Sequence, residues 1–232
     1  MKGRYKTLRV LGIITVFFLF ALFILFRPLK DTPLDTSDFK PISDPALARK
    51  FAPKFIAHSE YGKPEKILFR MALAANGQTH IAYHPWYATE FNPHAGFMPL
   101  LSRILYTGGL GIKDTMFGPN DIELIEIILD SAGNPIKLSY ESAMKYRKTA
   151  FGVTHKAVEE TLNGKPQNYC FKVTTWNHMV DHVGSSACNA QPEIPLAYFT
   201  NAEWEASRMV KRSEAILRRN RAHRVYERLG VE

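Results

Sequence analysis

Short apolar runs separated by turn-forming residues along the middle of the chain predict β-strands and hairpins. The clearest case is a hairpin with strands over residues 66–74 and 79–86. Asn76 and Gly77 lie between the two apolar runs, and both residue types tolerate the positive φ angles of a type I′ turn. We therefore expect an antiparallel pair joined by a tight turn.

A second hairpin is predicted further along the chain. Its strands cover residues 121–129 and 136–141, and the turn-forming stretch 131–135 separates them. Residues 167–176 form another predicted strand, whereas residues 154–162 have the composition of a short helix. These elements predict a mainly β (α+β) domain, built as a β-sandwich with hairpins.

Helix signals stand at both ends of this domain. Asp44 followed by Pro45 is typical of the start of a short helix. Thr200 and Glu203 form a capping box, and neither Gly nor Pro follows before Gly230, so a long C-terminal helix is expected.

Residues 87–119 lie between the two hairpins and are rich in Gly and Pro. They predict a long irregular loop, a kind of segment that is often functional.

The N-terminal segment has a different pattern. Residues 1–9 carry four cations, and residues 10–26 contain no charged residue. This apolar run is near the lower length limit for a spanning helix, and no small-x-small cleavage site follows it. We expect an uncleaved signal anchor, with a cleaved signal peptide as the alternative. The positive-inside rule places the N-terminus in the cytoplasm and the main domain outside, in the periplasm, at the cell surface or in a lumen.

The predicted organisation has several parts in sequence. They are a basic cytoplasmic segment (1–9), a transmembrane signal anchor (10–26), a tether (27–44), the β-sandwich domain (45–199) and a basic C-terminal helix (200–232). The net charge of +8 belongs to the two ends, because residues 31–199 hold 16 basic and 17 acidic residues. Residues 31–199 therefore carry no excess positive charge, which argues against a nucleic-acid-binding protein.

The C-terminal helix is the basic part that could meet a partner. Arg218, Arg219 and Arg221 lie in its second half, and Trp204 begins its thin apolar stripe. These four residues are predicted to contact anionic membrane lipid or an acidic partner. The alternative is a solvated helix that packs on the domain through that stripe.

Cys170 and Cys188 are the two cysteines of the chain. In an oxidising compartment they could form a disulfide that closes a loop of about 18 residues. Two buried free thiols are the alternative. Without a CxxC spacing, the pair does not predict a zinc site.

Two carboxylates open the predicted strand 121–129. Asp121 and Glu123 are two residues apart, so their side chains point to the same side of a strand. Buried anions need cations, hydrogen-bond donors or a metal ion. Carboxylate oxygens suit Ca²⁺ or Mg²⁺, and a histidine such as His84 or His178 would also permit Mn²⁺ or Zn²⁺. The alternative is a pair of solvent-facing or arginine-paired carboxylates.

His178 and His182 have a spacing that would place both imidazoles on one side of a helix. Asn177 would cap that helix. For each histidine taken alone, a surface position or a hydrogen-bonded core position is the alternative.

Three motifs resemble the superfamily that joins necrosis-inducing (NPP1-type) proteins to Vps62-like proteins. They are LARKFAPKFIAHS (47–59), NDIELIEIILDSAGNPIKLSYES (120–142) and GKPQNYCFKVTTWNHMV (164–180). The resemblance implies a β-sandwich with one divalent cation, for which Asp121 and Glu123 would be ligands by position. Asp114 would be a third ligand by a looser analogy.

The chain departs from the heptapeptide of the necrosis-inducing branch at two positions. Gly118 and Asn120 stand where that motif has its two histidines. His84 or His178 would then supply the missing ligand.

These patterns favour a membrane-anchored extracytoplasmic binding module. Its cation-assisted site would hold a glycan, a lipid headgroup or an envelope partner, with contact surface from the loop 84–119. The alternatives are a metal-dependent hydrolase of an ester or phosphodiester and a structural envelope protein. G-x-S-x-G, H-E-x-x-H and P-loop motifs are absent from the sequence, which favours binding over catalysis.

Overall fold

The computed structural model describes residues 38–56, 60–108, 113–114, 118–165, 168–184, 188 and 193–209, together with 12, 15 and 16. The chain divides into two compact units, Met1–Thr32 and Pro33–Glu232, and the fold below is that of the second. Most of the predicted anchor and tether, and Arg218, Arg219 and Arg221, lie outside the described residues. Within the described part of the chain, no helix has the length and apolar character needed to cross a membrane.

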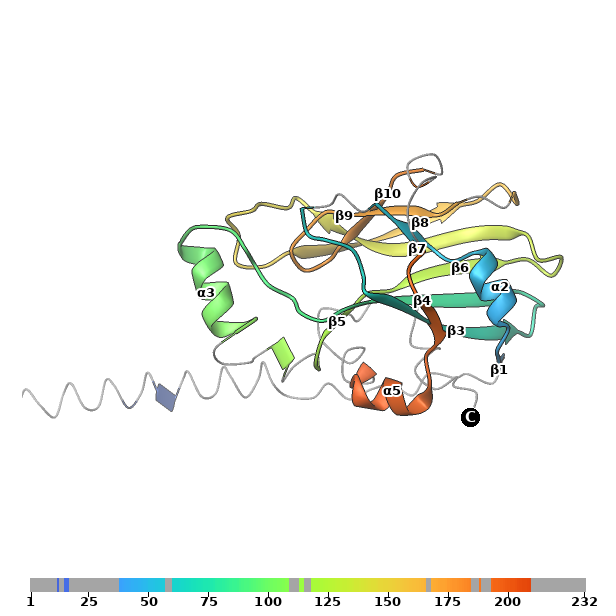
Figure 1. Ribbon diagram of the computed structural model, residues 1–232, viewed down its shortest axis with the longest axis horizontal. Coiled ribbons are helices and arrows are strands. Elements are labelled where there is room, and N and C mark those ends of the chain that lie inside the picture. The colour runs from blue at the N-terminus through green and yellow to red at the C-terminus, as the bar shows by residue number, and fades with distance from the viewer. Residues whose placement is uncertain are drawn as a thin grey trace, which may run out of the picture. The chain divides into compact units, whose positions relative to one another are not determined.

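The domain is mainly β (Figure 1). In chain order the strands are β1 (Phe39–Ile42), β2 (Lys54–Phe55), β3 (Lys66–Ala74), β4 (Thr79–Tyr87), β5 (Asp121–Ile122), β6 (Ile125–Leu129), β7 (Pro135–Met144), β8 (Thr154–Thr161), β9 (Cys170–Val173), β10 (Val180–His182) and β11 (Leu196–Tyr198). The helices are α2 (Pro45–Lys50), α3 (Phe97–Leu105) and α5 (Asn201–Ala206).

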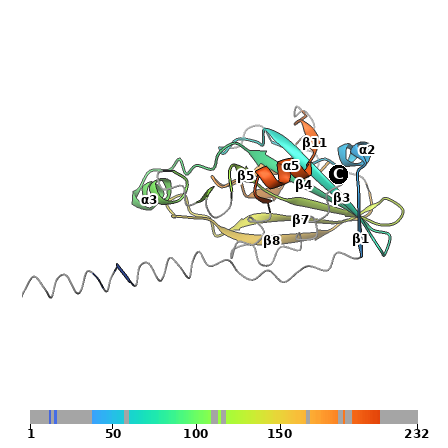
Figure 2. The same cartoon turned by 90° about the horizontal axis from the view of Figure 1, so that it is seen from below.

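The strands form two sheets. The larger has the order β1-β3-β4-β6-β7-β8, with β11 added parallel to β3 and β5 added antiparallel to β4. The smaller has the order β10-β9-β2. Phe55 and Phe171 of the small sheet share one hydrophobic core with Ile81 and Ile127 of the large sheet. A second cluster, which includes Phe199 and Trp204, covers the other face beside α5 (Figures 1 and 2).

The first hairpin is confirmed, but its turn differs from the expected type. β3 and β4 pair antiparallel from Lys66↔Trp86 to Leu73↔Thr79. Gly77 has a φ of 82°, whereas Asn76 is not among the described non-glycine residues with positive φ. Type I′ needs positive φ at both central positions, so the prediction of that turn was wrong. A longer loop with glycine in the left-handed position connects the strands instead.

The predicted strand 121–129 is interrupted in the middle. β5 and β6 both pair with β4 in one continuous register, with Trp86↔Ile122 and Tyr83↔Ile125. Pro85 faces Glu123 at the break; the Glu123 amide donates to its carbonyl oxygen at 3.0 Å. Pro85 has no N–H to return the second bond of this antiparallel pair, which explains the interruption.

Residues 154–162 were expected to form a helix, and that prediction was wrong. β8 pairs along its full length with β7, from Lys137↔Thr161 to Met144↔Thr154. It is the last strand of the large sheet, and it alternates exposed with partly buried positions. Its lysine and glutamate side chains suit an exposed sheet edge. Pairing with a distant strand has overridden the local helix preference.

Both predicted helix starts are confirmed. The Asp44 side chain accepts a hydrogen bond from the Leu47 amide at 2.9 Å, and Pro45 opens α2. Thr200 and Glu203 make the reciprocal capping box of α5. Helix α5 nevertheless ends at Ala206, because Arg208 has a φ of 51°, a left-handed conformation that terminates a helix.

The segment 87–119 is less irregular than its composition indicated, because it contains α3. The disulfide between Cys170 and Cys188 is confirmed, and it closes a loop of 18 residues. It ties Cys170, the first residue of β9, to Cys188.

Candidate functional site

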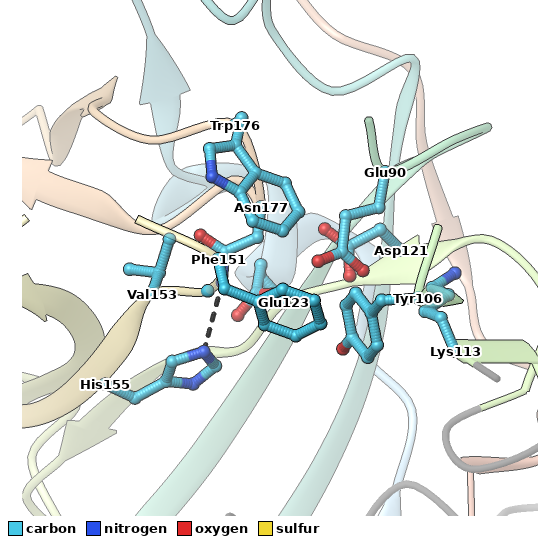
Figure 3. A pocket seen from close by; sticks show the side chains of 11 residues that line it. Glu90, Tyr106, Lys113, Asp121, Glu123, Phe151, Val153, His155, Trp176 and Asn177 are labelled. Carbon is cyan, nitrogen blue, oxygen red and sulfur yellow. Dashed lines mark hydrogen bonds between the residues drawn. The ribbon is translucent and has the colours of Figure 1, made fainter. Parts of the chain in front are cut away.

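Asp121 and Glu123 lie together at the edge of one pocket, near the end of the sheet where β5 begins. The cavity has a volume of about 200 Å³. Separate parts of the chain converge on it: the loop after β4, the region after α3, β5, the β7–β8 connection and the turn between β9 and β10 (Figure 3). Its lining residues are Glu90, Tyr106, Lys113, Asp121, Glu123, Phe151, Gly152, Val153, His155, Trp176 and Asn177.

Three carboxylates of this pocket are buried. Glu90, Asp121 and Glu123 are each less than a tenth exposed. Figure 3 shows the Glu90 and Asp121 carboxylates side by side, with Glu123 deeper in the view. Strand β5 places Asp121 and Glu123 because the pairing with β4 turns both side chains to the same side.

His178 pairs directly with Asp121. Its Nδ1 lies 2.7 Å from Asp121 Oδ2, so the Nδ1–H group donates a hydrogen bond to the carboxylate. The imidazole also stacks on Tyr87, with ring centroids 3.8 Å apart and an interplanar angle of 6°. Stacking on Tyr87 fixes the plane of the imidazole, and the hydrogen bond to Asp121 fixes its rotation in that plane. The same hydrogen bond orients the Asp121 carboxylate.

Tyr87 reports the electrostatic character of the site. Burial raises the pKa of its hydroxyl well above 10.0, and the nearby carboxylates of Glu123 and Asp121 raise that pKa further. The described residues offer no hydrogen-bond partner to this hydroxyl. Burial and these two carboxylates together keep the hydroxyl in its neutral form.

Lys113 is the cation of the pocket. Its side chain is almost fully buried, and its Nζ donates to the Asn120 carbonyl oxygen. Asp114 is its neighbour, with Oδ1 3.5 Å from the Lys113 ammonium and a side chain that is 66% exposed. Asp114 therefore faces solvent and does not line the pocket.

His155 forms the opposite wall and is held on both ring nitrogens. Its Nδ1 lies 2.7 Å from Glu141 Oε2, and its Nε2 lies 3.1 Å from Asn177 Nδ2. The Thr175 hydroxyl donates to Asn177 Oδ1, which turns the amide NH₂ toward the imidazole. His155 Nε2 is then an acceptor, and the Nδ1–H donates to Glu141.

Trp176 supplies a flat apolar wall and a buried donor. It is 2% exposed, and its indole nitrogen has no hydrogen-bond partner among the described residues. Phe151 and Val153 lie beside it in the pocket (Figure 3).

The structure separates the other predicted site residues from this pocket. His84 packs edge-on against Phe199 and Trp204, with ring centroids 5.3 Å and 5.4 Å away. Trp204 is itself buried in this second cluster, so it lies inside the domain and not on its surface. The helical pairing of His178 with His182 was wrong, because His178 lies in a turn and His182 in β10.

The described residues do not form a ready metal site. No group of three His, Cys, Asp or Glu side chains among them is arranged to hold a metal ion. Asp121 is already bonded to His178, and Asp114 and His84 lie elsewhere. The divalent cation therefore stays a prediction, and Asp121 with Glu123 remains its candidate pair.

Sequence reasoning missed Glu90, Lys113 and His155. Glu90 and Lys113 lie in the predicted irregular loop, where no periodicity marks a residue as buried. His155 was assigned to a helix, and only the pairing Ala143↔His155 brings it near Glu141. The general expectation that a long loop between strands is functional was the one signal that pointed to this region.

Comparisons with protein-family models, with curated proteins and with solved structures gave no match. The resemblance to the NPP1-type and Vps62-like superfamily stays a prediction, and function must be argued from the pocket.

Proposed function

We propose that the protein is a membrane-anchored extracytoplasmic binding module and that its pocket binds a sugar ring. The observation that supports this most is chemical: three buried carboxylates, a buried amide and a buried tryptophan line one cavity of about 200 Å³. Carboxylate and amide oxygens accept hydrogen bonds from hydroxyl groups, and the Trp176 ring adds an apolar face.

The charge of the pocket narrows the class of sugar. Among the lining residues that the structure describes, three are acidic and one is a lysine, so acidic groups predominate. Neutral and amino sugars fit this acidic lining, whereas sulfated sugars, sialic acids and phosphate groups are repelled. This charge balance also disfavours a phosphodiester substrate.

Size and shape point the same way. The cavity is smaller than the roughly 300–1,000 Å³ of pockets for drug-sized ligands, so it suits one ring of a longer chain. Trp176 and Phe151 provide apolar faces of the kind on which the C–H side of a sugar can rest. The ring could belong to a glycan or to a glycolipid headgroup.

The compartment is part of the proposal. The apolar run 10–26 behind a basic segment favours an anchor with the domain outside the cytoplasm. The disulfide supports an oxidising environment, since such bonds are rare in the cytosol. We further propose a β-sandwich organisation for the two sheets and a basic C-terminal helix beyond residue 209.

The test is binding of the purified full chain to an array of neutral, amino, sulfated and sialylated glycans. Neutral or amino sugars should be retained. Glu123→Gln should weaken retention by about tenfold or more, because it removes a charged hydrogen-bond acceptor. Asp114→Asn, which changes an exposed carboxylate of the same region, should have little effect. Equal binding by both variants, or retention of acidic sugars alone, would overturn the proposal.

A metal assay should run beside it. Mass spectrometry of the purified chain, compared with the Asp121→Asn/Glu123→Gln double variant, measures whether these acids hold an ion. A stoichiometric ion lost in the variant would make the sugar site cation-assisted. An ion-free protein that still binds sugar would show direct recognition.

Hydrolysis is the second candidate, and the geometry of His155 favours it. Glu141 orients the His155 imidazole at the pocket wall, and Nε2 would act as a general base once it releases the Asn177 amide. Incubation with a bound glycan ester, followed by product analysis, separates the cases. The protein is a hydrolase if it releases product and if His155→Gln abolishes this release while binding persists.

A further inference from the structure

Helix α3 turns its apolar face outward. Phe97, Leu100 and Ile104 recur at the spacing of one helix face, and they are 74%, 47% and 50% exposed. Met98 beside them is also exposed. This is the reverse of the usual arrangement, in which an amphipathic helix buries its apolar face.

The polar residues of the same helix face the protein. Ser102 is fully buried. Arg103 donates to the carbonyl oxygens of Asn92 and His94 at 2.8 Å and 2.7 Å. These bonds fix the helix on the loop that precedes it, so the outward direction of the apolar face is built into the fold.

Basic residues border this apolar face. His94 Nε2 lies 3.1 Å from the Tyr146 hydroxyl, which brings the β7–β8 turn next to the loop that leads into α3. Lys145 and Arg147 flank Tyr146 and are exposed. The sequence of α3 contains no acidic residue.

We propose that α3 and the β7–β8 turn dock the domain on the surface of an anionic lipid bilayer. The aromatic and aliphatic residues of α3 would enter the headgroup and acyl boundary, and Lys145 and Arg147 would meet anionic headgroups. The apolar outer face of α3 protrudes, and the exposed charged residues named beside it, Lys145 and Arg147, are both basic, which complements an anionic headgroup layer. That combination favours lipid over a protein partner.

Helix α3 lies at the opposite end of the domain from β1 (Figures 1 and 2). The inference takes from the proposed function only that the domain lies beside a membrane.

The experiment uses the full chain in vesicles of phosphatidylcholine and phosphatidylglycerol in equal parts. Leu100→Cys, labelled with an environment-sensitive fluorophore, should be quenched by nitroxide-bearing acyl chains. Leu73→Cys is the matched control, since Leu73 is also an exposed apolar residue but pairs with Lys40 of β1 at the other end. Both native cysteines are in the disulfide, so the added thiol is labelled selectively.

We expect several-fold stronger quenching at position 100 than at position 73. Ile104→Glu in the labelled chain, and separately Lys145→Glu/Arg147→Glu, should each reduce the quenching at position 100 while the thermal midpoint is unchanged. Equal quenching at both positions would overturn the proposal. A fluorescence change that grows with protein concentration and does not depend on the nitroxide would also overturn the proposal. It would indicate contact between two copies of the chain.

An alkaline wash separates this inference from the anchor. A chain that the wash removes, but whose position 100 is quenched at neutral pH, supports docking and overturns the anchor. A chain that withstands the wash without quenching at position 100 overturns docking alone. Glycan retention is measured apart from both, so a failure of the pocket is recognised independently.

Discussion

Gly118 and Asn120 show how a single backbone position limits the choice of residue. Gly118 has a φ of +86°, and a Cβ added there would lie 2.8 Å from the Ser207 carbonyl oxygen. Asn120 has a φ of 63°, which asparagine tolerates better than most residues. A side chain as large as histidine would not fit this backbone at position 118.

We predict that Gly118→Ala lowers the free energy of unfolding by about 1–3 kcal/mol, from the positive φ and the close carbonyl together. Gly152→Ala is the matched control, because that glycine has no atom near its added Cβ and no positive φ. Urea unfolding of both variants measures the difference. Equal stability of the two variants would contradict the backbone explanation.

At the scale of elements, the turn between β6 and β7 depends on Asp130. Its Oδ1 accepts hydrogen bonds from the Ala132 and Asn134 amides at 2.9 Å and 2.8 Å. These bonds lower the pKa of the carboxyl below its usual 3.8, and the bond from the Asn134 amide has the largest effect. The charged form is therefore the one that stabilises the turn.

The pH dependence of this turn follows from the sign of the shift. A lowered folded-state pKa stabilises the fold above the unfolded-state pKa, and this contribution is lost as the pH falls through the folded-state value. Asp130→Ala should thus lower the thermal midpoint at neutral pH and lose its effect in acid well below pH 3.8. Thermal unfolding of both proteins across this range tests it, and a pH-independent difference would exclude the carboxylate as the cause.

Arg70 joins two elements, β3 and α5. It is 1% exposed; its Nε donates to the Phe199 carbonyl oxygen at 3.0 Å, and an Nη donates to Asn201 Oδ1 at 2.9 Å. Its guanidinium lies 3.9 Å from the centroid of the Trp204 ring. Burial lowers the pKa of this guanidinium to about 10. Arg70 therefore holds α5 against the outer face of the large sheet.

Arg70→Lys keeps the charge but loses the planar fork and its stacking. We expect a loss of about 2 kcal/mol in the free energy of unfolding, the size of one charged hydrogen bond left unmade. Arg49→Lys is the control, since the Arg49 side chain is 64% exposed and lies 3.9 Å from Glu193. Chemical denaturation measures the stability of both variants. If Arg70→Lys leaves the free energy of unfolding unchanged, α5 is held by Phe199 and Trp204 alone.

At the scale of the whole molecule, a shared core holds the two sheets together, and the disulfide braces the small sheet. Phe171 of β9 contributes to that core beside Cys170, the first residue of the same strand. The covalent bond then connects the small sheet to Cys188 across 18 residues. A compact arrangement of both sheets is what keeps the turn with Trp176 and Asn177 opposite β5.

Removal of the disulfide should weaken the molecule as a whole. Cys170→Ala/Cys188→Ala is expected to lose about 3 kcal/mol, the loop-entropy value for this loop length. Reduction of the native protein should produce a similar loss and leave the double variant unchanged. Sugar retention should fall together with stability, because the turn that carries Asn177 follows β9. A disulfide-free protein of native stability would contradict this view.

Much of the local structure was predictable from sequence, because its causes are local. Apolar runs flanked by turn-forming residues located β3, β4 and β7, and cap residues located the starts of α2 and α5. A chain with two cysteines has one possible intramolecular disulfide, so that pairing needed no geometry. The side-by-side position of Asp121 and Glu123 follows from the pleat of a strand.

Tertiary structure decided the features that depend on distant partners. Residues 154–161 are a strand because β7 offers an edge to pair with, and Pro85 interrupts a strand far along the chain because it faces Glu123. The pocket joins segments that no sequence pattern links, including Glu90 and His155. The outward apolar face of α3 likewise results from Arg103, whose bonds to the preceding loop set the rotation of the helix. Hydrogen bonds between remote residues set these features, and sequence periodicity records only which side of an element is apolar.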